Sequence, residues 1–401
     1  MTTEGSSLCN SLIISILNKI THINKWKRVF LCETLTLFLT IKGRINFLQL
    51  ERYGKYNEQR YRQQFEKPFD YMAFNTELVK SHGSGHYIIA LDPSFIAKAG
   101  KKTPGIGYFW SGQAARTKRG LELLGMAAID VDNHTGFHLD ACQTLTVDHP
   151  EKSLAEIYAD SFTAHSGKLM ELSRVAVADA WFTKKSFIDA VCGAGFHFVG
   201  RMRDDANLKY LYNGPQQPGP GRPKKYDGNV NHKDIKTEHF HQVLLADGTL
   251  ATTTVAYAVS LQRNVRVVRV PVGKTHKLYF STDTQMDAAT IVRYYRLRFQ
   301  IEFIYRDAKQ FTGLENCQAR TENKLHSHFN MALTATNVAK VAHWLSIPQQ
   351  QRGAFSMADI KTMNHNALLM DRFFSTFGVT PHLKKNQKLV KELIMYGTIA
   401  A

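Results

Sequence analysis

The sequence predicts an α/β fold, in which a mixed β-sheet is covered by helices and is joined to a helical N-terminal region and a β-rich insertion. The chain has 401 residues, which is long enough for two or three domains. Short apolar runs of strand length alternate with helical patterns through its middle, in the order β-β-β-α-β-α-β. Three consecutive strands followed by strands that alternate with helices indicate a mixed sheet with helices on its faces.

About the first 80 residues read as helical, and a helix-turn-helix is one interpretation of them. Two amphipathic segments, Leu35–Tyr53 and Asn57–Phe65, meet at a glycine break, and Asn57 is a suitable N-cap for the second segment. Arg60 and Arg62 on the second segment are therefore candidate DNA contacts. A plain helical hairpin with a solvated basic face explains the same pattern equally well.

The central region changes to strand-like patterns. Asp132–Gly136 joins two of the strands and is a strong hairpin signal. The basic stretch Arg116–Arg119 lies between the first two strands and is expected to belong to a loop. The expected elements are strands at Tyr87–Leu91, Gly125–Val131 and Phe137–Leu145, a helix at about Ser153–Lys168, a strand at Val175–Ala178, a helix at Thr183–Ala194 and a strand at Phe196–Gly200.

From Asp204 onward the pattern indicates a separate β-rich insertion. A Gly/Pro-rich basic stretch, Asn213–Lys225, is expected to be a loop. Strands at Leu250–Leu261, Val265–Val270 and Lys277–Ser281 follow, then helices at Asp283–Phe311, at Leu325–Leu345 and from about Ser356. The predicted divisions are a helical domain (1–80), the first part of the central α/β domain (85–203), the β-rich insertion (204–285), the second part of the central domain (286–345) and a helical C-terminal region (346–401).

The charge balance favours a polyanionic partner. The chain has 51 Lys and Arg against 34 Asp and Glu, a net charge of +17, which is typical of nucleic-acid-binding proteins. An acidic membrane surface is the rival partner, but the most apolar stretch, Val29–Ile41, is too short to span a bilayer and contains Glu33. No secretion signal is recognisable, so we expect a cytoplasmic protein.

The cysteines and paired histidines do not predict a metal site. The five cysteines are scattered, and no pair has the spacing of zinc ligands, so reduced thiols are expected. Histidines two residues apart are more often surface residues than ligands when no third ligand has a suitable spacing. The pairs to which this applies are His239 with His241 and His326 with His328.

Two aspartates occupy equivalent places in the predicted sheet. Asp92 and Asp179 each directly follow an apolar strand, and carboxylates at the ends of neighbouring strands can converge on one divalent cation. Either residue alone is more often a turn or capping residue. Asp130 and Asp132 flank the hairpin and are expected to face solvent.

A third acid lies on a predicted helix with a distinctive pattern around it. Tyr295, Arg298, Glu302 and Lys309 are spaced 3, 4 and 7 residues apart, which places them on one face of a continuous helix. On such a face the carboxylate can complete a metal site while the cations and the phenol hold phosphates. Alternatively, Arg298 and Glu302 form an ordinary surface ion pair worth a few tenths of a kcal/mol.

The pattern Y-x2-R-x3-E-x6-K formed by these four residues resembles the signature of the insertion-sequence-four family of bacterial DDE transposases. The first-aspartate region of the family is similar to Leu91–Ser94, and the second is similar to Ala178–Phe182. Gly200–Arg203 also resembles the family's pattern. The resemblance covers roughly residues 85–345 and implies an RNase H-like fold with a β insertion between the second aspartate and the glutamate.

The resemblance also implies the site residues and the cofactor. Asp92, Asp179 and Glu302 would be the catalytic residues and would ligate two Mg²⁺ or Mn²⁺ ions. Two ions in such a site assist the attack of water on a phosphodiester and stabilise the leaving 3′ oxygen. The residues expected to bind DNA are Tyr295, Arg298, Lys309, Arg201 and Arg203, together with Arg60 and Arg62 of the helical region.

The expected function is that of a cut-and-paste DNA transposase, which cleaves at transposon ends and transfers the freed 3′ ends to target DNA. Double-stranded DNA is the expected partner, without a membrane, and the pairing of two ends implies a homodimer on DNA. The expected location is the bacterial cytoplasm, in association with the nucleoid. Two alternatives stay open: an RNase H-like endonuclease without strand transfer, and a non-enzymatic DNA-binding protein derived from a transposase.

Overall fold

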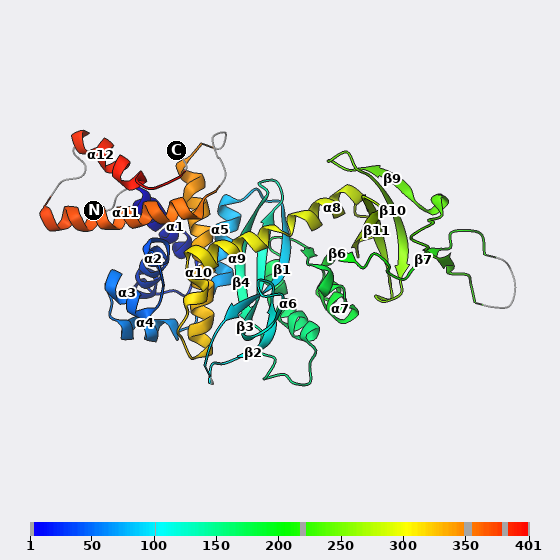
Figure 1. Ribbon diagram of the computed structural model, residues 1–401, viewed down its shortest axis with the longest axis horizontal. Helices are drawn as coiled ribbons and strands as arrows, with labels where there is room; N and C mark the ends of the chain where they lie inside the picture. Colours follow the sequence, from blue (N-terminus) through cyan, green and yellow to red (C-terminus); the bar gives the residue numbers. More distant parts are fainter. Residues whose placement is uncertain (1–3, 101, 217–221, 349–354, 379–383, 400–401) are drawn as a thin grey trace.

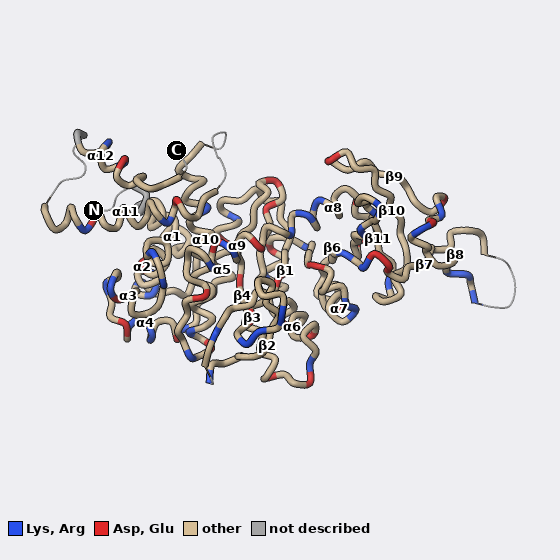
Figure 2. The backbone as a smooth tube through the Cα atoms, viewed as in Figure 1, with Lys and Arg blue, Asp and Glu red and all other residues tan. Residues whose placement is uncertain are grey.

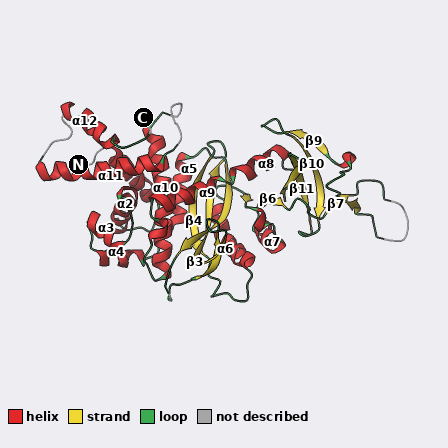
Figure 3. Ribbon diagram, in the orientation of Figure 1, coloured by secondary structure: helices red, strands yellow, loops and turns green. Residues whose placement is uncertain are grey.

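The computed structural model describes residues 4–100, 102–216, 222–348, 355–378 and 384–399. The molecule is elongated (Figure 1), with a helical body that contains both described ends of the chain, a sheet at its centre and a β-rich lobe at the far end. Figure 3 shows the same division by element type, with helices gathered at one end and strands running away from them. No helix in the described ranges is both long and apolar enough to cross a membrane.

A mixed sheet of 12 strands runs through the described part of the molecule, so the expected mixed α/β architecture is confirmed. The strand order is β2-β3-β1-β5-β6-β12-β11-β10-β7-β8, with β4 beside β3 and β9 beside β10. The strands are β1 (Tyr87–Ala97), β2 (Gly107–Ser111), β3 (Arg116–Asp130), β4 (Thr135–Gln143), β5 (Val175–Val177), β6 (His197–Met202), β7 (Leu208–Leu211), β8 (Tyr226–Asn229), β9 (His241–Leu244), β10 (Leu250–Ala258), β11 (Arg263–Val272) and β12 (Thr275–Ser281).

The helices cover the central strands and build the body at the N-terminal end. They are α1 (Glu4–Lys19), α2 (Lys25–Thr40), α3 (Phe47–Tyr53), α4 (Glu58–Phe65), α5 (Tyr71–His82), α6 (Leu154–Leu169), α7 (Lys185–Gly193), α8 (Ala288–Leu297), α9 (Gln300–Phe311), α10 (Glu322–Ser346), α11 (Met357–Phe377) and α12 (Lys384–Met395). One contiguous hydrophobic core joins the N-terminal helices, the sheet and the strands of the lobe. The chain therefore buries its apolar residues across the predicted divisions rather than within each of them.

The first strand is longer than predicted. β1 does not end at Asp92 but continues to Ala97, because it pairs with β3 along its whole length. On its other side β1 pairs with β5 only at Ile89 and Ala90. The parallel ladder has thus ended before Pro93, which has no backbone N–H to contribute to it.

The predicted hairpin between β3 and β4 is confirmed, but β3 begins before its apolar part. Arg116–Arg119, expected in a loop, pairs with β2, a strand that the apolar pattern did not reveal. These residues are exposed, so pairing rather than burial sets their strand conformation. Asp130, expected to face solvent, is fully buried, and its carboxylate accepts hydrogen bonds from Ser84 and Asn133.

The β-rich insertion continues the central sheet instead of forming a separate one. β12 pairs antiparallel with β6, at Leu278 with Met202 and at Ser281 with Val199. Three further short strands, β7, β8 and β9, complete the lobe beside the three that were predicted. In the predicted basic loop, residues 213–216 and 222–225 have no regular structure, and residues 217–221 lie outside the described ranges.

Two predicted helices are broken in the structure. The segment Leu35–Tyr53 divides into α2 and α3, because Gly43 adopts φ +85° and Asn46 caps a new helix. Asn57 caps α4 as predicted, accepting a hydrogen bond from the backbone N–H of Arg60. The helix expected at residues 283–311 is divided between α8 and α9 by a tightened turn at positions 298–299.

Helix α10 closes the free edge of the central sheet. The amide of Asn330 both donates to the carbonyl and accepts from the N–H of Ala141 on β4, at 3.0 and 2.9 Å. Asn337 makes the same two bonds with the backbone of His138, at 2.7 and 2.9 Å. Two side-chain amides therefore satisfy backbone groups that an edge strand would otherwise expose.

Candidate active site

Two aspartates lie at the same level of two neighbouring parallel strands. In the β1–β5 ladder Ala90 pairs with Val177, so Asp92 and Asp179, each two residues further along, emerge side by side. The chain leaves β5 directly into the 3-10 helix η1 (Ala180–Phe182), and the Asp179 carboxylate caps it by accepting from the Trp181 N–H at 2.9 Å. The equivalent positions predicted from the sequence therefore correspond to adjacent positions in space.

Helix α9 brings the third acid, Glu302, to the same strands. The helix packs against β1, β3 and β4, and the phenol of Tyr305 donates to the backbone carbonyl of Asp92 at 2.8 Å. Gly125 on β3 makes this approach possible, since a Cβ at that position would lie 2.0 Å from the Tyr305 oxygen. A close helix–strand fit thus fixes the height of Glu302 relative to Asp92.

Arg298 lies between two of the acids. Its guanidinium is 3.7 Å from the Asp92 carboxylate and 3.1 Å from that of Glu302, and its side chain is 13% exposed. The ion pair considered as an alternative is therefore present, but its arginine is largely enclosed and also pairs with Asp92. The Nε atom of Arg298 is also buried and has no hydrogen-bond partner among the described residues.

Tyr295 and Lys309 complete the set, although the four signature residues lie on two helices and the turn between them rather than on one helix. The Tyr295 ring packs on Tyr279 with 4.9 Å between centroids, and the Arg298 guanidinium lies 5.8 Å from its centre. Lys309 donates to the carbonyl of Phe95 on β1 at 2.9 Å. Arg298, at the turn between the two helices, still reaches both Tyr295 and Glu302.

Burial and like charge act together on Asp92. Desolvation raises its pKa to about 7, Arg298 opposes this shift, and the negative charges of Asp179 and Glu302 add to it. Carboxylate pKa values rise in this way where acids gather in a dry site with too little positive charge. The imbalance indicates a site that gains stability from additional cations.

The donor set of the three acids fits hard divalent cations. Mg²⁺ and Mn²⁺ prefer oxygen ligands, and all three residues supply carboxylates from converging elements. Among the described residues, only a different group of three has all its ligand atoms within 4.8 Å of one another. Asp92, Asp179 and Glu302 are close enough to affect one another's charge, but their carboxylate oxygens do not all lie within 4.8 Å of one another.

Arg201 and Arg203, expected as DNA contacts, have different surroundings. Arg201 lies on β6 opposite Tyr279, pairs with Asp204 at 3.2 Å, and its charge acts on Tyr295. Arg203 has an 85% exposed side chain and pairs only with its neighbour Asp205 in the described structure. Arg201 therefore adjoins the acid site, whereas Arg203 is a surface residue beside it.

The structure separates Arg60 from Arg62. Arg62 projects from α4 into a cleft of about 1210 Å³, whereas Arg60 lies outside it. Ala97, the last residue of β1, is among the residues that line the cleft. Its cationic lining is Arg44, Arg62, Lys98, Lys102, Arg320 and Lys324. Figure 2 shows that Lys and Arg are spread over both the helical body and the lobe, so this cleft is a local concentration within a generally basic molecule.

Two further groups of residues were missed by the sequence interpretation. The cleft cations come from four separate segments and form no motif, so only the fold brings them together. Asp140, Cys142 and His165 form the close group of potential metal ligands. His328, expected at the surface, is 2% exposed and bonds to the carbonyl of Gly313.

Comparisons with known proteins identify the family. A family model described as "Transposase DDE domain" matches residues 83–338, which is more than half of the chain. A solved structure with weak similarity is a piggyBac transposase synaptic complex with hairpin DNA; it is 12% identical, the match covers 99% of this chain and 86% of that one, and the TM-score is 0.40. No curated protein matches. The chain, with Asp92, Asp179 and Glu302 inside the matched region, belongs to the transposase DDE domain family.

Proposed function

We propose that the protein is a DNA transposase that cuts both ends of a mobile element and joins the freed 3′ ends to target DNA. The observation that carries the proposal is the placement of Asp92 on β1 and of Asp179 two residues beyond the adjacent parallel strand β5, with Glu302 facing them from α9, inside the matched region. Three carboxylates converging from rigid elements are suited to phosphodiester chemistry assisted by divalent ions.

The topology supports an RNase H-like assignment for the central part of the sheet. The order β4-β3-β1-β5-β6 consists of three antiparallel strands followed by two parallel ones. We place the catalytic domain at residues 85–203 and 286–345, with the strands of 204–285 as an extension of its sheet. The N-terminal and C-terminal helical regions remain proposed divisions at 1–80 and 346–401.

We propose that Asp92, Asp179 and Glu302 hold two Mg²⁺ or Mn²⁺ ions, which would supply Lewis acidity at the attacking and leaving oxygens. The chain itself positions these acids: η1 orients Asp179, and Tyr305 fixes the backbone of Asp92. Because desolvation and neighbouring acids raise the pKa of Asp92 to about 7, cations in the site would favour its ionised form.

Arg298, Tyr295 and Lys309 are proposed to hold the DNA phosphate beside the acids. The buried Nε of Arg298 is an unused donor among the described residues, and a phosphate oxygen would satisfy it. Its ion pairs with Asp92 and Glu302 would then be exchanged for phosphate and metal contacts. Tyr295 is held by Tyr279 and Arg298, so we assign it a binding role and not that of a covalent nucleophile.

The basic cleft is the proposed path of the DNA away from the acids. It adjoins the site through Glu315, which lines the cleft and lies 3.6 Å from the Lys309 ammonium. Six cations in one cleft would give salt-dependent affinity for the phosphate backbone without sequence specificity. We propose double-stranded DNA as the partner, and a homodimer as the form that pairs two element ends.

The proposal is tested by incubating the purified protein with Mg²⁺ and a supercoiled plasmid that carries the two ends of its own element. We expect cleavage at those ends, followed by strand-transfer products. Glu302→Gln should abolish both, whereas Glu171→Gln, which removes an exposed acid paired with Lys80, should not. Cleavage without joined products would indicate an endonuclease. Specific binding without cleavage by the wild type would indicate a non-enzymatic DNA-binding protein.

A further inference from the structure

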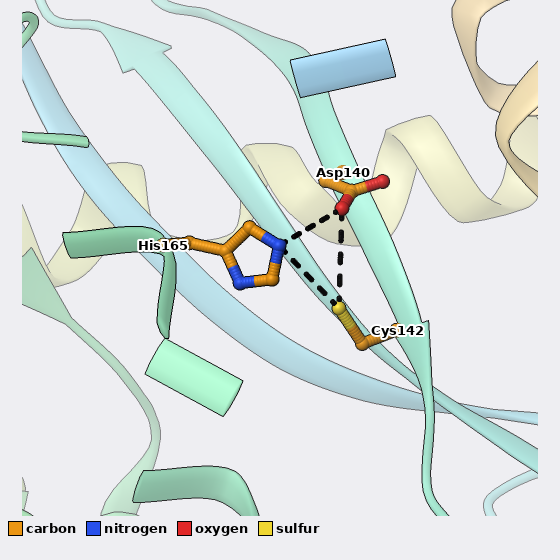
Figure 4. Close-up of side chains that lie close together, drawn as sticks. All are labelled: Asp140, Cys142 and His165. Atoms are coloured by element: carbon orange, nitrogen blue, oxygen red, sulfur yellow. Dashed lines mark hydrogen bonds and ion pairs between the residues drawn. The ribbon is translucent and has the colours of Figure 1, made fainter. Parts of the chain in front are cut away.

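A second group of potential metal ligands lies on the opposite face of the sheet from the acids. Asp92 pairs with Gly125, and Gly125 pairs with Ala141 on β4, so these three positions share one face. Successive residues of a strand point to opposite faces, which places Asp140 and Cys142 on the other one. There they meet His165 from α6, as Figure 4 shows.

The distances between the ligand atoms are close to those of a tetrahedral site. His165 Nε2 lies 3.2 Å from Asp140 Oδ2. Cys142 Sγ lies 3.9 Å from each of these atoms. Around a zinc ion with bonds of about 2.0 Å to N and O and about 2.3 Å to S, the corresponding separations are roughly 3.3 and 3.5 Å. Shifts of a few tenths of an ångström would therefore close the site.

The orientation of His165 is that of a metal ligand. Its Nδ1 lies 2.7 Å from the carbonyl of Ser161, which can only accept, so Nδ1 carries a hydrogen. In the neutral ring, Nε2 then directs its lone pair at Asp140 and Cys142. Metal-bound histidines characteristically donate the other ring N–H to a carbonyl or carboxylate in this manner.

The Asp140 carboxylate is buried and is only partly satisfied by the protein. The residue is 5% exposed, and its Oδ1 atom is buried without a hydrogen-bond partner among the described residues. His326 Nε2 on α10 lies 3.6 Å from this oxygen, beyond hydrogen-bond distance. An ion bound to this carboxylate would compensate for its removal from water, while His326 would steady it from the opposite side.

We propose that Asp140, Cys142 and His165 bind one divalent ion of the zinc type, at a site separate from the acid site. A thiolate and an imidazole beside one carboxylate favour Zn²⁺ over Mg²⁺, which prefers oxygen ligands alone. The fourth position is open to water, since the His165 side chain is 26% exposed. The ion would tie α6 to β4, an edge strand of the central sheet. The proposal does not depend on the proposed function.

The alternative is an ion pair between Asp140 and a protonated His165, with Cys142 as a bystander. The two states differ in composition, so metal analysis separates them. The untagged full chain is purified without chelator, dialysed against micromolar Zn²⁺ and then against buffer, and its metal content is measured. We expect one Zn²⁺ per chain in the wild type and in Asp92→Asn, which leaves this site intact.

Matched variants locate the ion. Cys142→Ser and His165→Gln should lose the zinc, whereas Cys192→Ser and His149→Gln, outside the group, should keep it. Replacement of Zn²⁺ by Co²⁺ in the wild type should give a thiolate-to-metal absorption band that requires no variant to fold. Absence of both the zinc and this band would overturn the proposal, as would retention of zinc by folded Cys142→Ser.

Discussion

Asp92 and Asp140 are two enclosed aspartates on strands of one sheet, but their surroundings shift their pKa values in opposite directions. Burial raises the pKa of Asp92 to about 7, with Asp179 and Glu302 adding to the effect against Arg298. Burial also acts to raise the pKa of Asp140, but the neighbouring imidazoles of His165 and His326 outweigh it and hold that pKa well below the usual range. Burial alone therefore does not determine the charge of a carboxylate. Neighbouring acids add to the cost of desolvation, whereas neighbouring bases offset it.

The same difference separates the kinds of ion that each site fits. Around Asp92 the donors are carboxylate oxygens, which suit hard cations and leave water positions for chemistry. Around Asp140 the donors include a thiol and an imidazole, which suit a borderline-soft ion such as Zn²⁺. The two proposed sites lie on opposite faces of the sheet, and each assignment can be tested against the other.

The largest effect is expected from Asp92→Asn, which should lower the rate of DNA cleavage by roughly 100- to 1000-fold through loss of charge stabilisation. Asp140→Asn should leave the rate of the folded protein within about tenfold of wild type, because it acts only through the scaffold. Single-turnover cleavage of end-containing DNA measures both. An equal loss in the two variants, with circular dichroism unchanged, would remove the distinction between the sites.

A smaller effect is expected from removal of zinc. If free Zn²⁺ stands at about a hundred times its Kd, binding stabilises the folded protein by about 3 kcal/mol, and a chelator removes that contribution. Thermal unfolding with and without a strong chelator should therefore shift in wild type and Cys192→Ser but not in Cys142→Ser. A shift that persists in Cys142→Ser would place the stabilising ion elsewhere.

Lys361 shows the effect of burial on a pKa when no charged neighbour contributes, for comparison with the two aspartates. Desolvation alone lowers its pKa to about 7, and its ammonium lies 2.6 Å from the carbonyl of Phe38. The folded pKa lies below the unfolded value, so the unfolded chain binds more protons between about pH 7 and 10 and stability rises with pH across that window.

Lys361→Met should therefore increase the free energy of unfolding at pH 7, on the order of 2 kcal/mol, and the gain should shrink towards pH 10. Urea unfolding of both proteins at several pH values measures the difference. A gain that is constant with pH would mean that Lys361 is not held neutral by burial.

The smallest expected effect concerns DNA binding by the two arginines beside the acid site, Arg201 and Arg203. Arg201→Ala should weaken binding of end DNA by about tenfold at low salt, because its charge reaches Tyr295. Arg203→Ala should change binding less than threefold, as expected for an exposed cation paired with Asp205. Fluorescence anisotropy titrations compare the two variants. A larger loss of affinity in Arg203→Ala would indicate that the DNA lies further from the acid site than proposed.

Much of the fold was predictable because the relevant signals are local. The hairpin after Asp130, the N-cap at Asn57 and the strands before Asp92 and Asp179 all depend on residues a few positions apart. Glu302 could be singled out from the sequence because the residue spacing and the family resemblance both pointed to it. In the structure these residues converge, with Arg298 between two of them.

The remaining features depend on contacts that no short window of sequence contains. The start of β3 at Arg116 is exposed and is a strand only because β2 pairs with it. The turn at Arg298 interrupts a pattern that is helical on both sides. Cys142 and His165 are 23 positions apart, on a strand and a helix, so a search for paired cysteines or closely spaced histidines could not connect them.

The continuous ladder from β6 to β12 fixes the distance between the β-rich lobe and the strand that carries Asp92. From β1 to β10 the sheet takes five steps, at about 4.8 Å each, or about 24 Å. Backbone hydrogen bonds hold that separation, as a flexible tether would not. A duplex that rests on β10 while its backbone reaches Asp92 would thus be measured at roughly seven base pairs of about 3.4 Å.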